Sequence, residues 1–322
     1  MLDDDLLGFG SPSLFASQPT TTKLFRPRRR SMGWRQMGRM EATRMHEWSA
    51  DDADREQRLR VKDLRASANP VHHELARILE ECRPSSRCMN AACAICSREF
   101  GMVVGPQIAA HCDRWSATAT TTFGTIFRRA WLVKPGRLDR INISRLKAML
   151  TRQFARRFNK CLVMGTIEVV WRPEFRRFLV HAHFVLVGAP PEAVSENLKD
   201  TYPSFRAKLR DRRILAHPKY RRHPRHKLRA RKMRDIPDVA GLAGYFTKFS
   251  TAMKEKLVGR DGRLQPGATK RPPTDIHVEL LAFLGRHCHS ELMLWRHVRL
   301  SPKAQLFMPV RSYDTVASNF CD

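Results

Sequence analysis

The sequence predicts an α+β protein, in which helices flank a central antiparallel β-sheet and a cysteine-rich segment precedes the sheet. Two apolar runs rich in β-branched residues, about 161–171 and 178–187, are separated by a short loop, which is typical of a β-hairpin. Four cysteines between residues 82 and 96 indicate a metal site. Residues 142–158 carry apolar side chains at helical spacing: Leu146, Met149, Leu150 and Phe154.

The N-terminal third is expected to hold a tail and a helical region. Residues 1–45 mix Ser, Pro, Thr and Gly with a basic cluster and show no persistent period, so we expect a disordered basic tail. Helices are predicted around 51–66 and 70–82, the second opening after Pro70. Together with the cysteines they make a helical, zinc-binding region over 46–111.

A separate domain over 112–257 is expected to follow. The segment 115–123 is β-prone through its threonines and aromatic residues. After the hairpin we expect a helix near 191–210 and another at about 237–255. A strongly basic insertion, 206–234, lies between them.

The C-terminal part is predicted to contain a connection and one long helix. Residues 258–274 are rich in Gly and Pro, which favours a linker or mobile loop. The region 275–322 is interpreted as an amphipathic helix, about 275–296, followed by a tail.

The charge of the chain points to a polyanionic partner. The formal net charge is +28, far beyond what solubility requires, so a nucleic acid is the expected partner. A ribosomal or packaging protein without chemistry, or a surface that is simply rich in Arg, is the alternative. No apolar run approaches the ~18 residues of a membrane helix, and the start lacks the order of a signal peptide. We therefore expect a cytoplasmic protein, taken to be bacterial, that binds no membrane and keeps its eight cysteines reduced.

The cysteine-rich segment has the spacing of a metal site. A Cys-x-x-Cys pair lets two thiolates reach one ion, and two further cysteines complete a tetrahedron, so we predict a structural Zn²⁺. Cys112 or His111 is an alternative to the first ligand. Buried free thiols, or a redox pair within the group, are the competing interpretations. The predicted ligands follow the pattern C-x5-C-x4-C-x2-C: Cys82, Cys88, Cys93 and Cys96.

One predicted strand places two histidines side by side. His181 and His183 are two residues apart, so both project from the same face of the strand. A hairpin loop centred near 174–175 puts Glu168 opposite His181 on that face, whereas a slip of one residue turns it away. Two imidazoles and a carboxylate suit Mg²⁺ or Mn²⁺ on a phosphate substrate. The alternative is a pair of partly buried structural histidines.

A tyrosine and a lysine follow in a segment expected to be helical. Tyr245 and Lys248 are three residues apart and therefore share one helix face. They offer a nucleophile and a cation for phosphoryl transfer. A core tyrosine beside a solvated lysine is the competing interpretation.

Taken in order, these motifs resemble those of the HUH endonuclease superfamily, and within it the single-tyrosine rolling-circle replication initiators of bacterial plasmids and phages. The matching segments are Ser116 to Thr122, His181-Ala182-His183 and Tyr245-Phe246-Thr247-Lys248. The resemblance covers about 112–257, which it implies to be the catalytic domain, with a ferredoxin-like palm and flanking helices. It also implies a 5′-phosphotyrosine on Tyr245. Ala182 departs from the bulkier residue that the family often has there.

The basic insertion is the predicted DNA-binding element. Nearly half of its residues are Lys or Arg, and such density drives binding to phosphate backbones with a steep salt dependence. Solvated disorder is the alternative, and partial ordering on DNA would reconcile the two. The candidate contacts are Arg206, Arg210, Arg213, Arg221, Arg222, Arg225, Lys227 and Arg229.

The sequence therefore favours a metal-dependent DNA endonuclease and strand transferase that nicks single-stranded or cruciform origin DNA and initiates rolling-circle replication. A transposase or relaxase of the same chemistry is the nearest alternative. The competing class is a noncatalytic, zinc-containing nucleic-acid-binding protein. The sequence contains no Gly-x-x-x-x-Gly-Lys-Ser/Thr loop, so unwinding is expected to come from supercoiling or from a partner such as a host helicase.

Overall fold

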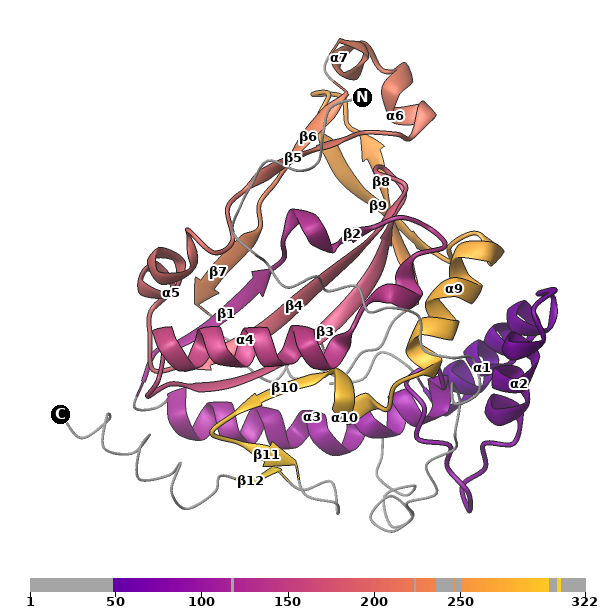
Figure 1. Cartoon of the computed structure of the whole chain (residues 1–322), viewed down its shortest axis with the longest axis horizontal. Helices are drawn as coiled ribbons and strands as arrows, with labels where there is room; N and C mark the ends of the chain where they lie inside the picture. Colours follow the sequence, from indigo (N-terminus) through magenta and orange to yellow (C-terminus); the bar gives the residue numbers. More distant parts are fainter. Residues whose placement is uncertain are drawn as a thin grey trace.

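One antiparallel sheet forms the centre of the molecule (Figure 1). The structure is a computed structural model that describes residues 49–116, 119–222, 224–235, 246, 251–300 and 306–307. The spatial order of the strands is β10 (Met293–Arg296), β3 (Leu162–Arg172), β4 (Arg177–Val187), β1 (Thr121–Ile126) and β7 (Arg231–Asp235), with the short β2 (Leu132–Val133) paired to β4. Every one of these pairings is antiparallel. The predicted α+β class with an antiparallel sheet and helices is confirmed.

The β3–β4 hairpin is the longest pairing of the sheet. Its register joins Leu162 to Val187 at one end and Arg172 to Arg177 at the other. The tight connection between them contains Arg176, whose φ of 48° lies in the left-handed region. The predicted hairpin of 161–171 and 178–187 is therefore confirmed to within one residue at its ends.

A single phenylalanine locks three strands together. Phe184 on β4 is fully buried and lies between Gly165 on β3 and Gly124 on β1, its direct neighbours in the two ladders. A Cβ at either glycine would come closer than 3.0 Å to Phe184 or to the backbone beside it. The Phe154 ring of helix α4 meets Phe184 edge-on at 4.9 Å between centroids. This packing fixes the register of β3, β4 and β1.

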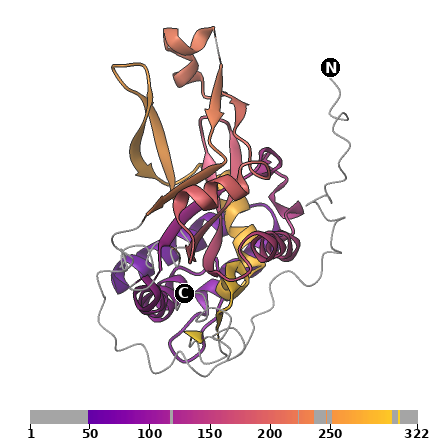
Figure 2. The same cartoon turned by 90° about the vertical axis from the view of Figure 1, so that its left-hand side faces the viewer.

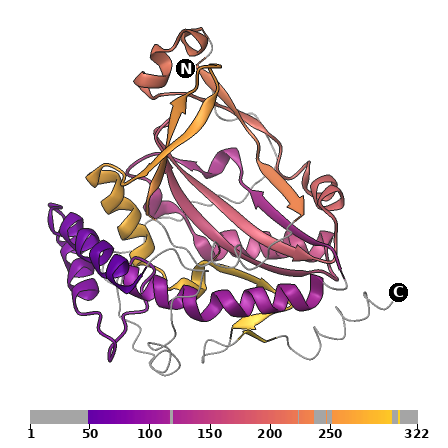
Figure 3. The same cartoon turned by 180° about the vertical axis from the view of Figure 1, so that it is seen from behind.

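Helices cover both faces of the sheet. Helix α4 (Ile143–Arg157) buries its apolar stripe against the Phe184 face, as its spacing predicted. Helix α3 (Ala94–Ser116) runs along the opposite face and contacts β1 and β4 (Figures 2 and 3). The short helix α5 (Pro191–Leu198) packs beside β7 and β1.

A helical layer closes one end of the sheet. Helices α1 (Ala50–Arg65) and α2 (Pro70–Glu80) pack on each other and on α9 (Thr274–Gly285). Ser49 caps α1 through a reciprocal pair of bonds with Asp52. Short 3₁₀ turns, Arg129–Trp131 and Leu138–Arg140, lead into and out of β2. None of the helices in the described part of the chain has the length and apolarity needed to cross a membrane.

Two ribbons project from the sheet at the apex of the molecule (Figures 1 and 2). The first pairs β5 (Phe205–Lys208) with β6 (Arg225–Leu228) and carries the short helices α6 (Arg212–Ala216) and α7 (Pro218–Arg221) at its tip. The second pairs β8 (Met253–Val258) with β9 (Leu264–Lys270). The carboxylate of Glu255 joins them, at 2.7 Å from Arg213 and 2.9 Å from Lys270.

Several predicted elements differ from the structure. The linker expected at 258–274 is mostly the β8–β9 hairpin, because Gly259 and Gly262 lie in its turn and Pro266 and Gly267 lie in strand β9. The helix expected at 237–255 gives way to strand β8 from Met253 onward, and most of its earlier residues lie outside the described part of the chain. The helix near 191–210 ends at Leu198, before strand β5.

Two further boundaries were also wrong. The C-terminal helix ends at Gly285, and the chain continues through α10 (His289–Leu292) into strand β10, which pairs with the free edge of β3. The strand expected at 115–123 begins only at Thr121, because helix α3 extends to Ser116. A small ladder, β11 (Arg299–Leu300) with β12 (Leu306–Phe307), follows β10.

Candidate metal centres and basic surface

The hairpin register brings a carboxylate and two histidines to one face of the sheet. Glu168 on β3 is directly opposite His181 on β4, as the loop length predicted. His183, two residues further along β4, projects from the same face. The Oε2 atom of Glu168 lies 3.3 Å from His181 Nε2 and 3.4 Å from His183 Nε2. Three potential ligand atoms therefore meet in one place, each within 4.8 Å of the others.

Neighbouring strands orient these imidazoles. The Thr125 hydroxyl on β1 lies 2.7 Å from His183 Nδ1. With a proton on Nδ1, the His183 ring donates to Thr125 and presents its Nε2 lone pair toward Glu168, the arrangement that metal-binding histidines use. The Leu179 carbonyl lies 3.4 Å from His181 Nδ1. The Phe123 ring stacks on His183 at 5.6 Å and 12°.

The Glu/His/His group contains one ionised carboxylate. Burial raises the pKa of Glu168, but the adjoining His183 and His181 lower it by more, so the pKa falls to about 2. Glu168 is thus a carboxylate, set with two imidazole nitrogens in a largely buried position. An anionic oxygen and two nitrogens are the donor set of a divalent ion, so the group could bind a metal. Carboxylate and phosphate oxygens suit Mg²⁺ or Mn²⁺, and of these two ions the imidazoles favour Mn²⁺, the transition metal.

The four predicted cysteines also converge. Cys82, Cys88, Cys93 and Cys96 are all buried, and their Sγ atoms lie within 4.8 Å of one another. Three Sγ–Sγ distances are 3.6, 3.6 and 3.7 Å. A tetrahedron with Zn–S bonds of about 2.3 Å has sulfur–sulfur edges of about 3.8 Å, whereas a disulfide needs about 2.05 Å. This four-cysteine group is therefore consistent with a structural zinc site and not with disulfides, and Cys112 and His111 are not part of it.

The surroundings of the four-cysteine group connect it to the rest of the fold. Burial raises the pKa of the Cys93 thiol, so four thiolates at this spacing need a cation to offset their charge. The backbone N–H of Cys96 points at Cys93 Sγ at 3.4 Å. Arg60 of α1, fully buried, donates to the carbonyl of Ala92 at 2.8 Å. The loop before the Cys-x-x-Cys pair also pairs with the chain around Cys288.

The predicted DNA contacts gather on the first ribbon, but not all are free. Arg206 faces Lys227 across the β5–β6 pair, and Arg225 faces Lys208, so four exposed cations share one side. Within the described residues no carboxylate forms an ion pair with any of the four. Like charges placed directly opposite are unfavourable without a counter-charge. This basic face, defined as Arg206, Lys208, Arg225 and Lys227, therefore suits a polyanion.

The remaining predicted contacts have different surroundings. Arg213 pairs with Asp211 and Glu255 and so braces the ribbons. The Arg221 side chain donates a hydrogen bond to the Ala216 carbonyl. The backbone N–H of Arg210 donates one to the backbone carbonyl of Glu174. Arg222 is exposed.

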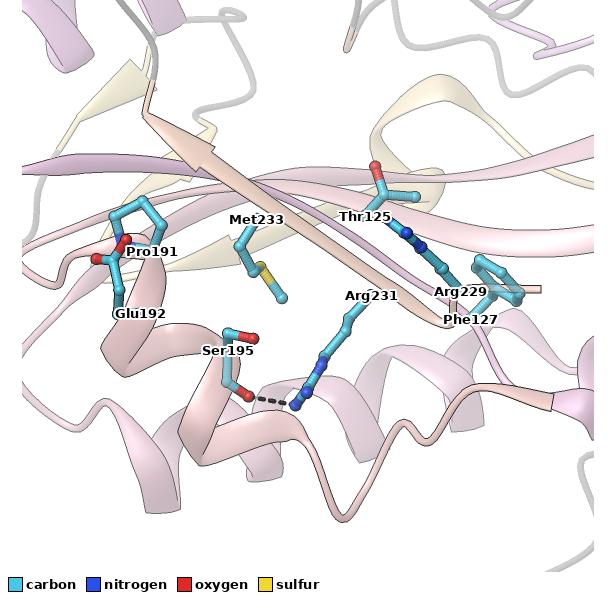
Figure 4. Close-up of a pocket in the computed structure, with 8 residues that line it drawn as sticks. All are labelled: Thr125, Phe127, Pro191, Glu192, Ser195, Arg229, Arg231 and Met233. Carbon is cyan, nitrogen blue, oxygen red and sulfur yellow. Dashed lines mark hydrogen bonds between the residues drawn. The ribbon is translucent and has the colours of Figure 1, made fainter. Parts of the chain in front are cut away.

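Arg229 lines a pocket of about 690 Å³ between β7 and α5 (Figure 4). There Arg231 points to the Ser195 carbonyl, while the Thr125 hydroxyl points away from the pocket, toward the opposite face of the sheet. The pocket is thus on the far side of β1 and β7 from the Glu/His/His group.

The predicted nucleophile Tyr245 and its companion Lys248 lie outside the described residues. Phe246, the residue after Tyr245 in the sequence, is described: it is buried, and its ring lies 6.1 Å from that of Phe123. Because Phe123 stacks on His183, Phe246 packs against the layer of side chains that adjoins the Glu/His/His group.

Comparisons of the chain with models of known protein families, with curated proteins and with solved structures find no match. Sequence reasoning missed Lys208, because its place on the basic face depends on the pairing of β5 with β6. The alternation within residues 205–208 was the only available signal for Lys208.

Proposed function

We propose that the chain is a metal-dependent DNA endonuclease and strand transferase of the HUH type, acting as a rolling-circle replication initiator. The observation that carries the proposal is the meeting of Glu168, His181 and His183 on one face of the sheet, with Phe246 packed close by. The basic face and the net charge of +28 supply the affinity for DNA.

Each group of the chain has a role in the proposed reaction. Glu168, His181 and His183 would hold a divalent ion, Mn²⁺ or Mg²⁺, and Thr125 would fix the His183 ring. When bound, such an ion polarises a phosphate and offsets charge that develops on its oxygens. The Tyr245 phenol oxygen attacks the phosphorus of the scissile phosphodiester as its proton leaves for solvent. The bond to the 3′-oxygen breaks, and this oxygen takes up a proton.

The products explain why such a reaction suits replication. A 5′-phosphotyrosine retains the energy of the broken bond, so the strand can be rejoined without ATP. The free 3′-hydroxyl is a primer for a polymerase. Lys248, three residues after Tyr245, offsets the phosphate charge. In the four-cysteine group a structural Zn²⁺ would be held by Cys82, Cys88, Cys93 and Cys96, where it would tie α2 and α3 together.

The experiment is adduct formation with Mn²⁺. The full-length protein is incubated with supercoiled plasmid and with a pool of single-stranded oligonucleotides, and the products are separated under denaturing conditions. We expect a covalent protein–DNA species whose tryptic peptide carries the nucleotide on Tyr245. Tyr245→Phe should abolish it. Tyr220→Phe, which removes a phenol on the first ribbon, is the matched control and should leave it unchanged.

A second candidate function has its own support. The four-cysteine group and the basic face are sufficient for a noncatalytic, zinc-containing nucleic-acid-binding protein. DNA binding with no adduct in any substrate, at saturating Mn²⁺, would favour that function and end the enzymatic proposal. An adduct on a different tyrosine would retain the chemistry but remove Tyr245 from it. A transposase or relaxase would show the same adduct, and plasmid replication in cells separates those from an initiator.

A further inference from the structure

An arginine outside the predicted DNA contacts lies on the same face of the sheet as the Glu/His/His group. Arg234 on the edge strand β7 is directly opposite Phe123 on β1. Phe123 is two residues from Thr125, which is opposite His183 on β4. Since directly opposite residues share a face and alternate residues share a face, Arg234, Phe123 and His183 all belong to one side of the sheet.

The contacts of Arg234 place its charge close to the candidate metal centre. Its guanidinium carbon lies 5.0 Å from the centroid of the Phe123 ring. That ring stacks on His183 at 5.6 Å. The guanidinium is therefore no more than about 11 Å from the His183 ring. Neighbouring phosphates in an extended single strand are closer together than this limit, so a phosphate beside the scissile one lies within reach of the guanidinium.

The Arg234 guanidinium is available to a ligand. The side chain is exposed, and no carboxylate within the described ranges forms an ion pair with it. Arg231, three residues earlier, differs because it points to the other face and donates to the Ser195 carbonyl. A cation–π contact with a buried ring holds the Arg234 guanidinium in place without using its five N–H donors.

We propose that Arg234 binds a phosphate that neighbours the scissile one and so sets which phosphodiester lies at the Glu/His/His group. A planar guanidinium with two parallel N–H donors matches a phosphate in a bidentate manner. Phe123 is almost fully buried, so it supports the guanidinium and does not stack on a base. The ligand class is a single-stranded phosphodiester with at least one phosphate beyond the scissile one. This inference rests on the proposed function.

The test is a methylphosphonate scan of the nicked oligonucleotide. Each phosphate in turn is replaced by the neutral methylphosphonate, and the rate of adduct formation is measured for wild type and for Arg234→Gln. Arg234→Gln should slow the reaction of the unmodified strand by about 10- to 100-fold. One position near the nick should slow wild type by a similar factor and leave Arg234→Gln unaffected. Identical scan profiles for the two proteins would overturn the proposal.

Matched variants separate the contact from general charge. Arg206→Gln makes the same change on the basic face and should keep the wild-type scan profile at that position. Arg234→Lys retains the positive charge but lacks the two parallel N–H donors, so it should recover only part of the rate. Full recovery would refute bidentate binding. The Mn²⁺ affinity of Arg234→Gln, measured by electron paramagnetic resonance, should equal that of wild type. A loss of Mn²⁺ binding would place the effect at the metal and overturn the proposal.

Failure of the proposed function gives a different result. If wild type forms no adduct with any strand, the enzymatic proposal falls. The same scan is then read by fluorescence anisotropy in EDTA. One methylphosphonate position that weakens binding of wild type but not of Arg234→Gln would still establish the phosphate contact. If no position behaves in this way, the proposed phosphate contact of Arg234 is refuted as well.

Discussion

The two candidate metal groups differ in how the chain builds them. The four-cysteine group takes all its ligands from one short segment, 82–96, and buries every one of them. The Glu/His/His group takes three ligands from two strands and depends on their register. A closed set of four thiolates is typical of a structural ion, whereas three ligands leave coordination positions for a substrate. One region should therefore govern stability and the other chemistry.

The largest effect is expected from breaking the four-cysteine group. Cys93→Ser should lose the bound zinc and most of the stability of the N-terminal helical layer. Structural zinc contributes about 10 kcal/mol or more, which is comparable to the whole stability of a domain. Zinc content and thermal unfolding are the measurements. Cys288→Ser, outside the group, is the control; equal stability of the two variants would contradict a zinc brace.

A smaller effect on stability is expected at Gly165, where strand register also determines the position of a candidate metal ligand. Gly165→Ala should lower the free energy of unfolding by about 3 kcal/mol, because the new Cβ would overlap the backbone at His183. It should also weaken Mn²⁺ binding, since His183 must move. Gly136→Ala, in open space at a φ of 74°, is the control and should cost about 1 kcal/mol with no change in Mn²⁺ affinity. Urea unfolding and Mn²⁺ titration check both.

The region around the four-cysteine group should also carry a pH dependence. His289 is buried, stacks on Phe100 and bonds to Ser97, and burial lowers its pKa to about 3. Since the unfolded chain takes up this proton near pH 6.5 and the folded chain does not, stability should fall as the pH drops below 6.5. We expect a loss of about 2 kcal/mol between about pH 6.5 and about pH 5. His289→Phe should show a flatter profile in urea unfolding with zinc present; parallel profiles would refute the assignment.

The smallest effect on stability is expected at the Glu/His/His group, and it should accompany the largest loss of activity. Glu168→Gln preserves shape and should change the free energy of unfolding by less than about 1 kcal/mol. Adduct formation should fall by about a thousandfold. Glu192→Gln, on the far side of β7, is the control for both measurements. A large drop in stability with adduct formation retained would reverse the roles assigned to the two groups.

The sequence predicted local features of this molecule better than distant pairings. Two apolar runs joined by a loop centred near 174–175 predicted that Glu168 lies opposite His181, and the register of the hairpin confirms it. The Cys-x-x-Cys spacing indicated a metal group, but only the fold shows that Cys82 belongs to it and Cys112 does not. These predictions succeeded because neighbours in the chain determine them.

The remaining features depend on contacts that no local pattern records. The β8–β9 hairpin has the Gly and Pro content of a linker, so composition alone could not distinguish the two. Strand β10 exists because the edge of β3 is available to pair with it. The position of Arg234 requires β7 to pair with β1, more than a hundred residues earlier in the chain.

The packing of Phe184 between Gly124 and Gly165 has a consequence for how this protein can vary. The ring occupies the side of the sheet opposite the carboxylate and imidazoles, yet its fit decides their alignment. Substitutions on α4, such as at Phe154, would tilt the hairpin and retune ion affinity while every liganding residue stayed the same. The affinity of this group for an ion can therefore be changed at positions that contribute none of its ligands.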